Sequence, residues 1–172
     1  VTGTSTFITG ATGSDIVLDH ADNAFTSTVT MKADTGGNEA FGNITFVDSA
    51  DVKLHSSAST GGDLFLDGST DGAVGGNLSI TATTGNITQG VALAVTGTST
   101  FITGATGSNI ILDHADNAFS SWVKMEADDG SEAFGDITFV DSGAVVIQTS
   151  AATDADGELL IDAGTDGAVG GD

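Results

Sequence analysis

The sequence has no cysteine, proline, arginine or tyrosine, and lysine, its only other strongly basic residue, occurs 3 times. The lack of cysteine excludes a disulfide framework and thiolate metal sites. Nucleic-acid binding depends on cationic side chains that contact phosphates, so we expect no nucleic-acid partner. No apolar run approaches the roughly 18 residues of a membrane-spanning helix, so we expect no membrane span either.

Acidic residues dominate the charge of the 172-residue chain. Asp and Glu together number 24, and the formal net charge is −21. The hydrophobic fraction is nevertheless 39%. Disordered acidic tails lack the apolar residues needed for a core, so this composition indicates a folded protein.

A long internal repeat organises the sequence. VTGTSTFITGATGS at Val1–Ser14 returns unchanged at Val95–Ser108. AFGNITFVDS from residue 40 is matched by AFGDITFVDS from residue 133, and TDGAVGGN from residue 70 by TDGAVGGD from residue 165. The sequence therefore consists of one repeat copy at 1–94 and a truncated second copy at 95–172. We expect the two copies to form one continuous solenoid, in which successive turns of the chain stack on one another. We interpret the chain as a window on a longer array; the alternative is a complete protein of two copies.

Short β-branched and aromatic runs with period-2 alternation, bounded by Gly, Asn, Asp or Ser, predict an all-β fold. One set of apolar runs is spaced by 22, 23 and 26 residues, beginning at Phe7, Val29, Val52 and Leu78. A second set is less regularly spaced, beginning at Ile16, Ile44, Leu64 and Ile87. This spacing predicts a parallel β-helix, or β-solenoid, with about four rungs in each 94-residue repeat.

The competing architecture is a pair of tandem immunoglobulin-like β-sandwiches, because a 94-residue unit has the size of such a domain. The absence of proline favours the solenoid, whose interior strands all use their N–H groups. In the solenoid we expect Phe7, Val29 and Val52 to share one core. The copies should superpose by a translation of four rungs, with their length differences in loops near 36–38 and 154–155.

The negative charge points to cations as partners. A rod of about seven rungs stacked every 4.8 Å is roughly 35 Å long, which gives a charge density comparable to that of duplex DNA. Self-repulsion should make the fold depend on salt or divalent cations. Ca²⁺ prefers carboxylate oxygens, and the candidate ligands are Asp19, Asp22, Asp113, Asp116, Asp154, Asp156 and Glu158. The alternative is that each Asp forms a turn.

Histidine and tryptophan are the other residue types with a potential role in binding. His20 and His114 lie beside these carboxylates in LDHADNAF and are interpreted as surface residues that were copied with the repeat. Trp122 is the single tryptophan. It is a candidate for contact with a carbohydrate or a neighbouring rod, and the alternative is a place in the core or at its rim.

The segment GNLSITATTGNITQGVALAVTGTSTFITGATGSNIILDHADNAF, residues 76–119, resembles the repeats of large bacterial exoproteins of the filamentous-haemagglutinin type. The likeness lies in a GN-L-x-I-T strand, a GNITQ turn, an L-x-V-x-G strand and an NI-x-L-D segment ending in NAF. The resemblance implies a right-handed β-helical stalk that is secreted and displayed on a Gram-negative cell surface, often for adhesion.

These observations favour a structural role: a β-solenoid stalk or fibre-forming rod in an extracellular adhesin or filament. Its partners would be further copies of the repeat, in the same chain or end to end, and divalent cations. The alternative is a carbohydrate-binding or surface-binding adhesin module. We do not expect an enzyme. Duplicating rungs makes the rod longer, whereas a catalytic site occurs once in a protein.

Overall fold

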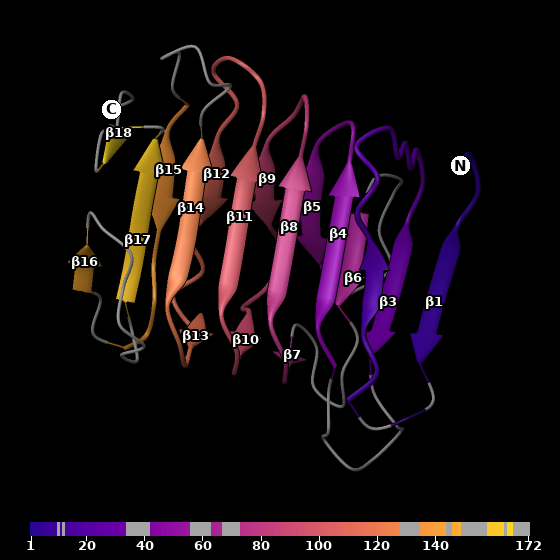
Figure 1. Ribbon diagram of the computed structural model, residues 1–172, viewed down its shortest axis with the longest axis horizontal. Helices are drawn as coiled ribbons and strands as arrows, with labels where there is room; N and C mark the ends of the chain where they lie inside the picture. Colours follow the sequence, from indigo (N-terminus) through magenta and orange to yellow (C-terminus); the bar gives the residue numbers. More distant parts are fainter. Residues whose placement is uncertain are drawn as a thin grey trace.

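The computed structural model describes residues 1–9, 11, 13–33, 42–55, 63–66, 73–127, 135–143, 146–148, 158–163 and 165–166. For residues 55, 63–66 and 73, and for every described residue from 146 onward, it describes the backbone alone. Within these ranges all regular structure is β-strand. The strands stack side by side along one rod, from the N-terminal to the C-terminal part of the chain (Figure 1).

Two long parallel sheets form the walls of the rod. In spatial order, the first sheet contains β1 (Ser5–Thr9), β3 (Val29–Ala33), β6 (Asp63–Leu66), β5 (Val52–His55), β9 (Ile87–Gln89), β12 (Ile110–Leu112) and β15 (Ile137–Phe139). The second sheet contains β2 (Ile16–Leu18), β4 (Ile44–Asp48), β8 (Leu78–Ala82), β11 (Ser99–Thr103), β14 (Val123–Ala127), β17 (Glu158–Ala163) and β16 (Val146–Gln148).

A short third sheet runs along one edge of the rod (Figure 1). Its parallel strands are β7 (Ala73–Val74), β10 (Ala94–Val95) and β13 (Ala118–Phe119). The last described strand, β18 (Thr165–Asp166), pairs antiparallel with β17. Successive strands of the chain mostly alternate between the two long sheets, so the chain winds around the rod. The prediction of a parallel β-solenoid is thus confirmed, and the alternative of antiparallel sandwiches was wrong.

Alternation of apolar and polar residues places the core between the sheets. In β3, β4, β8, β11 and β14 every second side chain is buried, as expected for strands with one face inward. Val29 and Val52 belong to one buried cluster, and Phe7 packs against it. The expectation that these three residues share a core is therefore confirmed.

Aromatic side chains stack along this core in the same way in both copies. Phe7 meets Phe25 edge to face with ring centroids 6.4 Å apart, and Phe25 lies 5.5 Å from Phe46. The equivalent rings of the second copy repeat this geometry with distances of 6.2 and 5.4 Å, for Phe101, Phe119 and Phe139. Edge-to-face and tilted rings stabilise such pairs beyond the burial of their area.

The rungs are less regular than the spacing of apolar runs suggested. Ser5 faces Val29, a step of 24 residues, but Ile44 faces Leu78, a step of 34. The expected range of 22 to 26 residues was therefore wrong for part of the rod. The irregularity occurs where two consecutive strands of the chain pair with each other, β5 with β6 in the first sheet and β16 with β17 in the second. In β1 to β4 the first predicted set of apolar runs lies in the first sheet and the second set in the second sheet. From β8 onward the two sets have exchanged sheets.

This exchange of sheets changes the relation between the two repeat copies. β1 lies in the first sheet, whereas its sequence equivalent β11 lies in the second, and β2 and β12 are exchanged in the opposite sense. The predicted superposition by a pure translation of four rungs was therefore wrong, because half a turn must be added. The length differences near 36–38 and 154–155 lie outside the described residues.

Candidate functional site

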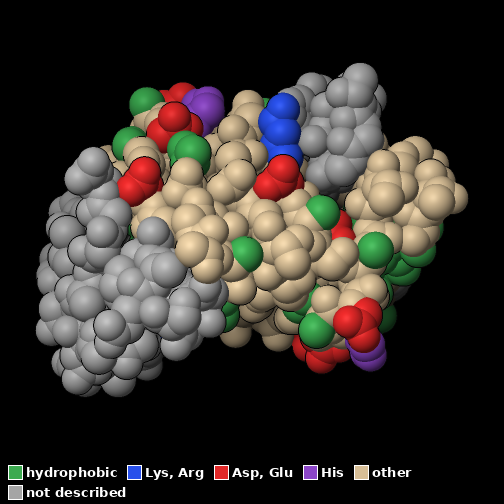
Figure 2. Space-filling model, turned by 90° about the horizontal axis from the view of Figure 1, so that it is seen from above, with side chains coloured by type: hydrophobic (Ala, Val, Ile, Leu, Met, Phe, Trp, Pro, Cys, Tyr) green, Lys and Arg blue, Asp and Glu red, His purple; other side chains and the backbone are tan. Residues whose placement is uncertain are grey.

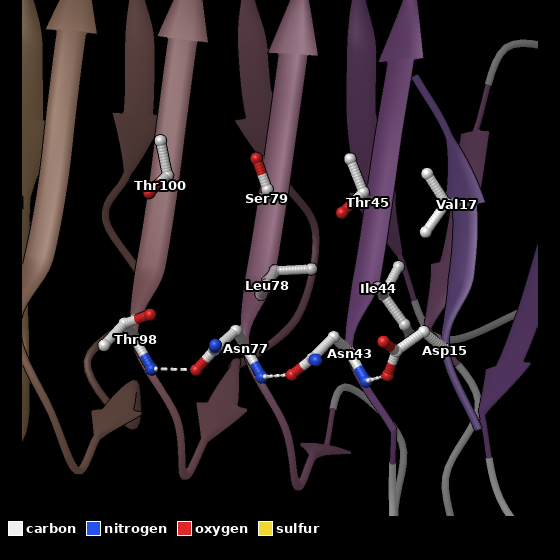
Figure 3. A pocket seen from close by; sticks show the side chains of 10 residues that line it. All are labelled: Asp15, Val17, Asn43, Ile44, Thr45, Asn77, Leu78, Ser79, Thr98 and Thr100. Carbon is white, nitrogen blue, oxygen red and sulfur yellow. Dashed lines mark hydrogen bonds between the residues drawn. The ribbon is translucent and has the colours of Figure 1, made fainter. Parts of the chain in front are cut away.

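A polar ladder runs along one edge of the second sheet, where the chain enters successive strands (Figure 3). The backbone N–H of Asn43 donates to Asp15 Oδ1 at 2.7 Å, and that of Asn77 donates to Asn43 Oδ1 at 2.7 Å. Thr98 N–H then donates to Asn77 Oδ1 at 2.8 Å. Each side chain thereby accepts the backbone N–H of the next rung, which ties the turns of neighbouring rungs together.

A second ladder of the same kind runs along the first sheet. Asn86 N–H donates to Asp51 Oδ1 at 2.6 Å, Asn109 N–H to Asn86 Oδ1 at 2.8 Å, and Asp136 N–H to Asn109 Oδ1 at 2.8 Å. These rung-to-rung bonds use the Oδ1 acceptor, which Asn and Asp both possess. This explains why Asp15 in the first copy can replace Asn109 of the second.

Glycine precedes several ladder residues because neighbouring rungs approach closely there. A Cβ atom on Gly42 would meet the backbone carbonyl of Ser14, and one on Gly135 would meet that of Ser108. No side chain fits at such a distance. These glycines are therefore required by the contact between rungs, and the repeat keeps them in both copies.

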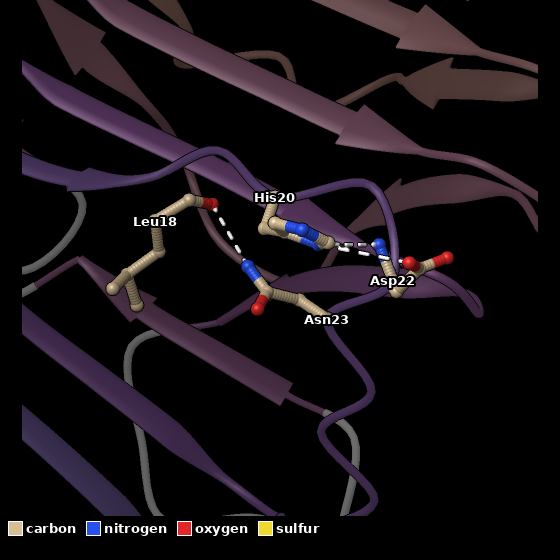
Figure 4. Close-up of polar contacts among 4 residues, drawn as sticks. All are labelled: Leu18, His20, Asp22 and Asn23. Atoms are coloured by element: carbon tan, nitrogen blue, oxygen red, sulfur yellow. Dashed lines mark hydrogen bonds and ion pairs between the residues drawn. The ribbon is translucent and has the colours of Figure 1, made fainter.

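The LDHADNAF segments form the same turn in both copies, with Asp19, Asp22, Asp113 and Asp116 exposed. In the first, Asn23 N–H donates to His20 O at 3.0 Å, and Asp22 N–H donates to His20 Nδ1 at 3.2 Å (Figure 4). Asn23 Nδ2 closes the loop by donating to Leu18 O at 3.3 Å. The second copy repeats the bond from Asp116 N–H to His114 Nδ1 at 3.2 Å. These histidines and acidic residues thus build the turn itself.

Asn117 is the most heavily bonded polar side chain inside the described part of the rod, with an exposed fraction of 0%. Its Oδ1 accepts from Leu93 N–H at 2.9 Å and Gln89 Nε2 at 2.8 Å. Its Nδ2 donates to Gln89 Oε1 at 3.0 Å, Val140 O at 2.9 Å and Leu112 O at 3.3 Å. This single amide therefore links three successive rungs.

Asp48 is the buried carboxylate of the described core, with an exposed fraction of 2%. Its Oδ1 accepts from Phe25 N–H at 3.1 Å and Ser49 N–H at 2.8 Å. Burial raises the pKa of Asp48 above its usual value, and the two backbone N–H donors oppose that rise only in part. In the second copy Asp141 Oδ1 accepts the equivalent bond from Phe119 N–H at 3.3 Å.

The four predicted calcium ligands that the structure describes lie at two separate turns. Asp19 and Asp22 are exposed at one turn, and Asp113 and Asp116 are exposed at the equivalent turn. Among the described residues no three His, Cys, Asp or Glu side chains come together as a metal site would require. Asp154 and Asp156 lie outside the described residues, and Glu158 is described only as part of the β17 backbone.

Trp122, the other predicted contact residue, is half-buried just before β14. Its backbone carbonyl accepts the N–H of Ser99 at 3.1 Å, so its main chain takes part in pairing between rungs. The same bond joins Ser5 N–H to Thr28 O in the first copy. The contact is therefore conserved where the side chain is not.

The two ladders were not predicted, although the sequence carries a signal for them. A Gly or Ser, an Asn or Asp, and an Ile or Leu stand together where strands begin. The triplets are SDI, GNI, GDL, GNL, GNI, SNI and GDI, ending at Ile16, Ile44, Leu64, Leu78, Ile87, Ile110 and Ile137. Each of them stands at the start of a strand in one of the two long sheets.

The surface above the first ladder is shallow and polar. A hollow of about 300 Å³ is lined by ladder residues and by outward Thr and Ser side chains of β4, β8 and β11 (Figure 3). Acidic side chains gather beside a histidine at two places, near the upper left and the lower right of Figure 2. The two places agree with the two LDHADNAF segments, one in each repeat copy.

Comparison with known proteins supports the repeat and gives no function. No curated protein and no solved structure matches the chain significantly. In the described part of the chain, no helix is long and apolar enough to cross a membrane. A family model described as repeats of unknown function (DUF5649) matches residues 1–32 and 41–126. Since this match covers most of the sequence, the chain belongs to the family of DUF5649 repeats.

Proposed function

We propose that the chain is a structural β-solenoid segment of a long secreted adhesin or extracellular filament, in which it acts as a stalk or fibre-forming rod. The observation that carries the proposal is the repetition of one bonding scheme along the rod. Asn43, Asn77, Asn86 and Asn109 each use Oδ1 to accept an N–H of the next rung. Such a scheme extends length without creating a singular site.

The resemblance to filamentous-haemagglutinin-type repeats supports this proposal in a specific way. The asparagines of its GNL, GNI and SNI elements are Asn77, Asn86 and Asn109, which are ladder residues. The motif that carries the resemblance therefore includes three residues that join rungs. A stalk in a surface-displayed protein needs this property, because it must project without unfolding.

The charge supports an extracellular rod as well. A net charge of −21 on 172 residues makes neighbouring rods repel one another in dilute salt. At higher ionic strength the Debye length falls from about 8 Å at 0.15 M to about 3 Å at 1 M, and this repulsion is screened. Saline or calcium-containing surroundings would therefore favour both the fold and lateral approach of rods.

The test of the rod is length. Chains with one, two and three additional 94-residue repeats should give particles that lengthen by a constant increment, about 20 Å for four strand spacings, with unchanged width. Small-angle scattering and electron microscopy measure both dimensions. Independent domains on flexible joints would instead give a length that scales with roughly the square root of repeat number, which would refute a rigid stalk.

The location and the adhesive alternative need separate measurements. An antibody against this segment should label intact cells of the source organism as strongly as permeabilised cells. Labelling only after permeabilisation would contradict a secreted surface protein. A glycan array probed with this segment should show no selective binding; a specific glycan signal lost in Trp122→Ala would instead support the carbohydrate-binding module.

A further inference from the structure

The N-terminal end of the described rod presents an open edge made by β1 and β2. Among the described strands, β1 pairs only with β3 and β2 only with β4, so each lies at the end of its sheet. Ile8 is 64% exposed and Val17 55% exposed. A hollow of about 430 Å³ lies along this edge, lined entirely by residues of the two strands and of the turn that leads into β2.

The same sequence is covered in the second copy. β11, which is identical to β1, pairs along its full length with β8, from Ser99 facing Leu78 to Thr103 facing Ala82. β12 pairs with β9, with Ile110 facing Ile87. Phe101 is consequently 0% exposed, whereas its equivalent Phe7 is half-buried.

Among the hydrogen bonds that attach the covering rung, four involve Thr98 and Asn109. Thr98 N–H donates to Asn77 Oδ1 at 2.8 Å, and Thr98 O accepts from Leu78 N–H at 2.9 Å. Asn109 N–H donates to Asn86 Oδ1 at 2.8 Å, and Asn109 O accepts from Ile87 N–H at 2.9 Å.

The open edge offers the same backbone groups at Thr4 and Asp15, the sequence equivalents of Thr98 and Asn109. Only the N–H and the carbonyl of Asn109 take part in attaching the covering rung, and its side chain points its acceptor to the following rung. The change from Asn to Asp at position 15 therefore leaves these groups intact. The open edge therefore presents both the apolar side chains and the backbone hydrogen-bonding groups that the covering rung contacts in the second copy.

We infer that the β1–β2 edge is a docking surface for one specific rung, the segment with the sequence of 77–94 from another copy of the repeat placed directly before Val1. This inference rests on the proposed rod. A separate copy of the chain cannot offer this rung, because β8 and β9 are interior strands with neighbours on both sides. A copy joined in front can, since Ala94 runs directly into Val95, the counterpart of Val1.

The test is a chain extended at its N-terminus by NLSITATTGNITQGVALA, the sequence of 77–94. The matched control carries the same extension with the positions of Ile80 and Ile87 changed to Asp, which places charges where the rung must enter the core. Hydrogen exchange of the β1 and β2 amides is measured in both chains and in the parent. The melting temperature is a second readout.

In the extended chain we expect exchange in β1 and β2 to slow by at least about tenfold, to the level of β11 and β12, because an edge strand becomes interior. The control should exchange like the parent. Unchanged exchange in the extended chain, or equal protection by the control, would overturn the inference. Equal protection by the free 77–94 peptide at stoichiometric concentration would contradict the inference that the rung must be joined covalently in front of Val1.

The outcome is separable from that of the proposed function. Protection of β1 and β2 in the extended chain, together with particles that fail to lengthen in proportion to repeat number, would retain the docking surface and remove the rigid stalk. Proportional lengthening without protection would do the reverse.

Discussion

The first fourteen residues of the two repeat copies are identical, yet the structure places them in different environments. Phe101 is completely buried between rungs, and the identical Phe7 is half-buried at the end of the rod. Ile8 is 64% exposed, whereas its counterpart Ile102 is half-buried. Local geometry does not differ, because the ring pairs Phe7–Phe25 and Phe101–Phe119 have nearly the same distance and angle.

The difference teaches that burial in a solenoid belongs to the stack of rungs. A rung has one inward face and two edges, and its neighbours cover the edges. The same residue can therefore contribute different amounts to stability in different copies. Matched substitutions in the two copies measure this neighbour contribution directly, because the sequence itself provides the control.

The largest difference is expected for the buried aromatic ring. Phe101→Ala should lower the free energy of unfolding by about 3–5 kcal/mol, because it opens a cavity in a fully packed core. Phe7→Ala should cost roughly half as much or less, because solvent already reaches that ring. Urea denaturation followed by circular dichroism measures both. Equal losses would mean that the end rung is as well covered as the interior one.

The next largest effect concerns the buried amide. Asn117→Ala removes the acceptor of Leu93 N–H and the donor to Val140 O, and buried groups left unpaired cost about 1–3 kcal/mol each. It also removes two of the hydrogen bonds of the Gln89 amide. Asn23→Ala removes a donor to Leu18 O in a half-buried turn and should cost about 1 kcal/mol. Thermal denaturation compares the two variants. A greater loss for Asn23→Ala would contradict the role assigned to Asn117.

Salt and calcium test whether the two exposed turns respond alike. Thermal stability should rise with NaCl as the charge of −21 is screened. If carboxylates chelate Ca²⁺, Ca²⁺ adds stability beyond NaCl of matched ionic strength, about 2.7 kcal/mol at a hundredfold excess over the dissociation constant. Asp19→Asn with Asp22→Asn, and Asp113→Asn with Asp116→Asn, should then reduce that gain equally. Full replacement of Ca²⁺ by NaCl would exclude chelation.

A smaller effect is expected in the ladder. Asn77→Ala removes the acceptor of Thr98 N–H and should cost about 1 kcal/mol. Asn77→Asp keeps Oδ1 and should be close to neutral, as the natural replacement of Asn109 by Asp15 suggests. Melting temperatures measured by calorimetry show whether the ladder needs only the Oδ1 acceptor at position 77 or also the Nδ2 group of the amide. A loss in Asn77→Asp as large as that in Asn77→Ala would show that the amide is required.

The smallest effect concerns the pKa of Asp48. Since burial raises its pKa in the folded state, the protonated form is favoured there, and the cost of ionisation is present above the folded pKa. The free energy of unfolding should therefore rise as the pH falls from above the folded pKa of Asp48 towards 3.8, the ordinary pKa of an Asp side chain. Asp48→Asn keeps the acceptor without the charge, so it should raise stability slightly at neutral pH and remove this dependence. Asp141→Asn, at the half-buried equivalent, is the control.

Particular residues show how far the sequence could predict the fold. Alternation in ITFVD and VTMKA identified the strands and their inward faces, because a strand places successive side chains on opposite sides. The choice of sheet for Leu78 could not be predicted, because its burial pattern is the same in either sheet. The calcium ligands were predicted from the net charge and from the recurrence of closely spaced carboxylates, such as Asp19 and Asp22, which does not show where their side chains point. Asn117 was missed because nothing in the sequence distinguishes it from Asn23.

The sequence by itself determined the local repeating unit: strands from alternation, turns from Gly, Asn and Asp, and ladder acceptors before strands. These are short-range properties, fixed by side-chain chemistry within a few residues. The tertiary structure alone decided which sheet each strand joins, the half turn between the copies, and which of two identical phenylalanines is buried. Those properties depend on loop lengths and on neighbouring rungs, since pairing between distant strands sets both the register and the burial of each rung.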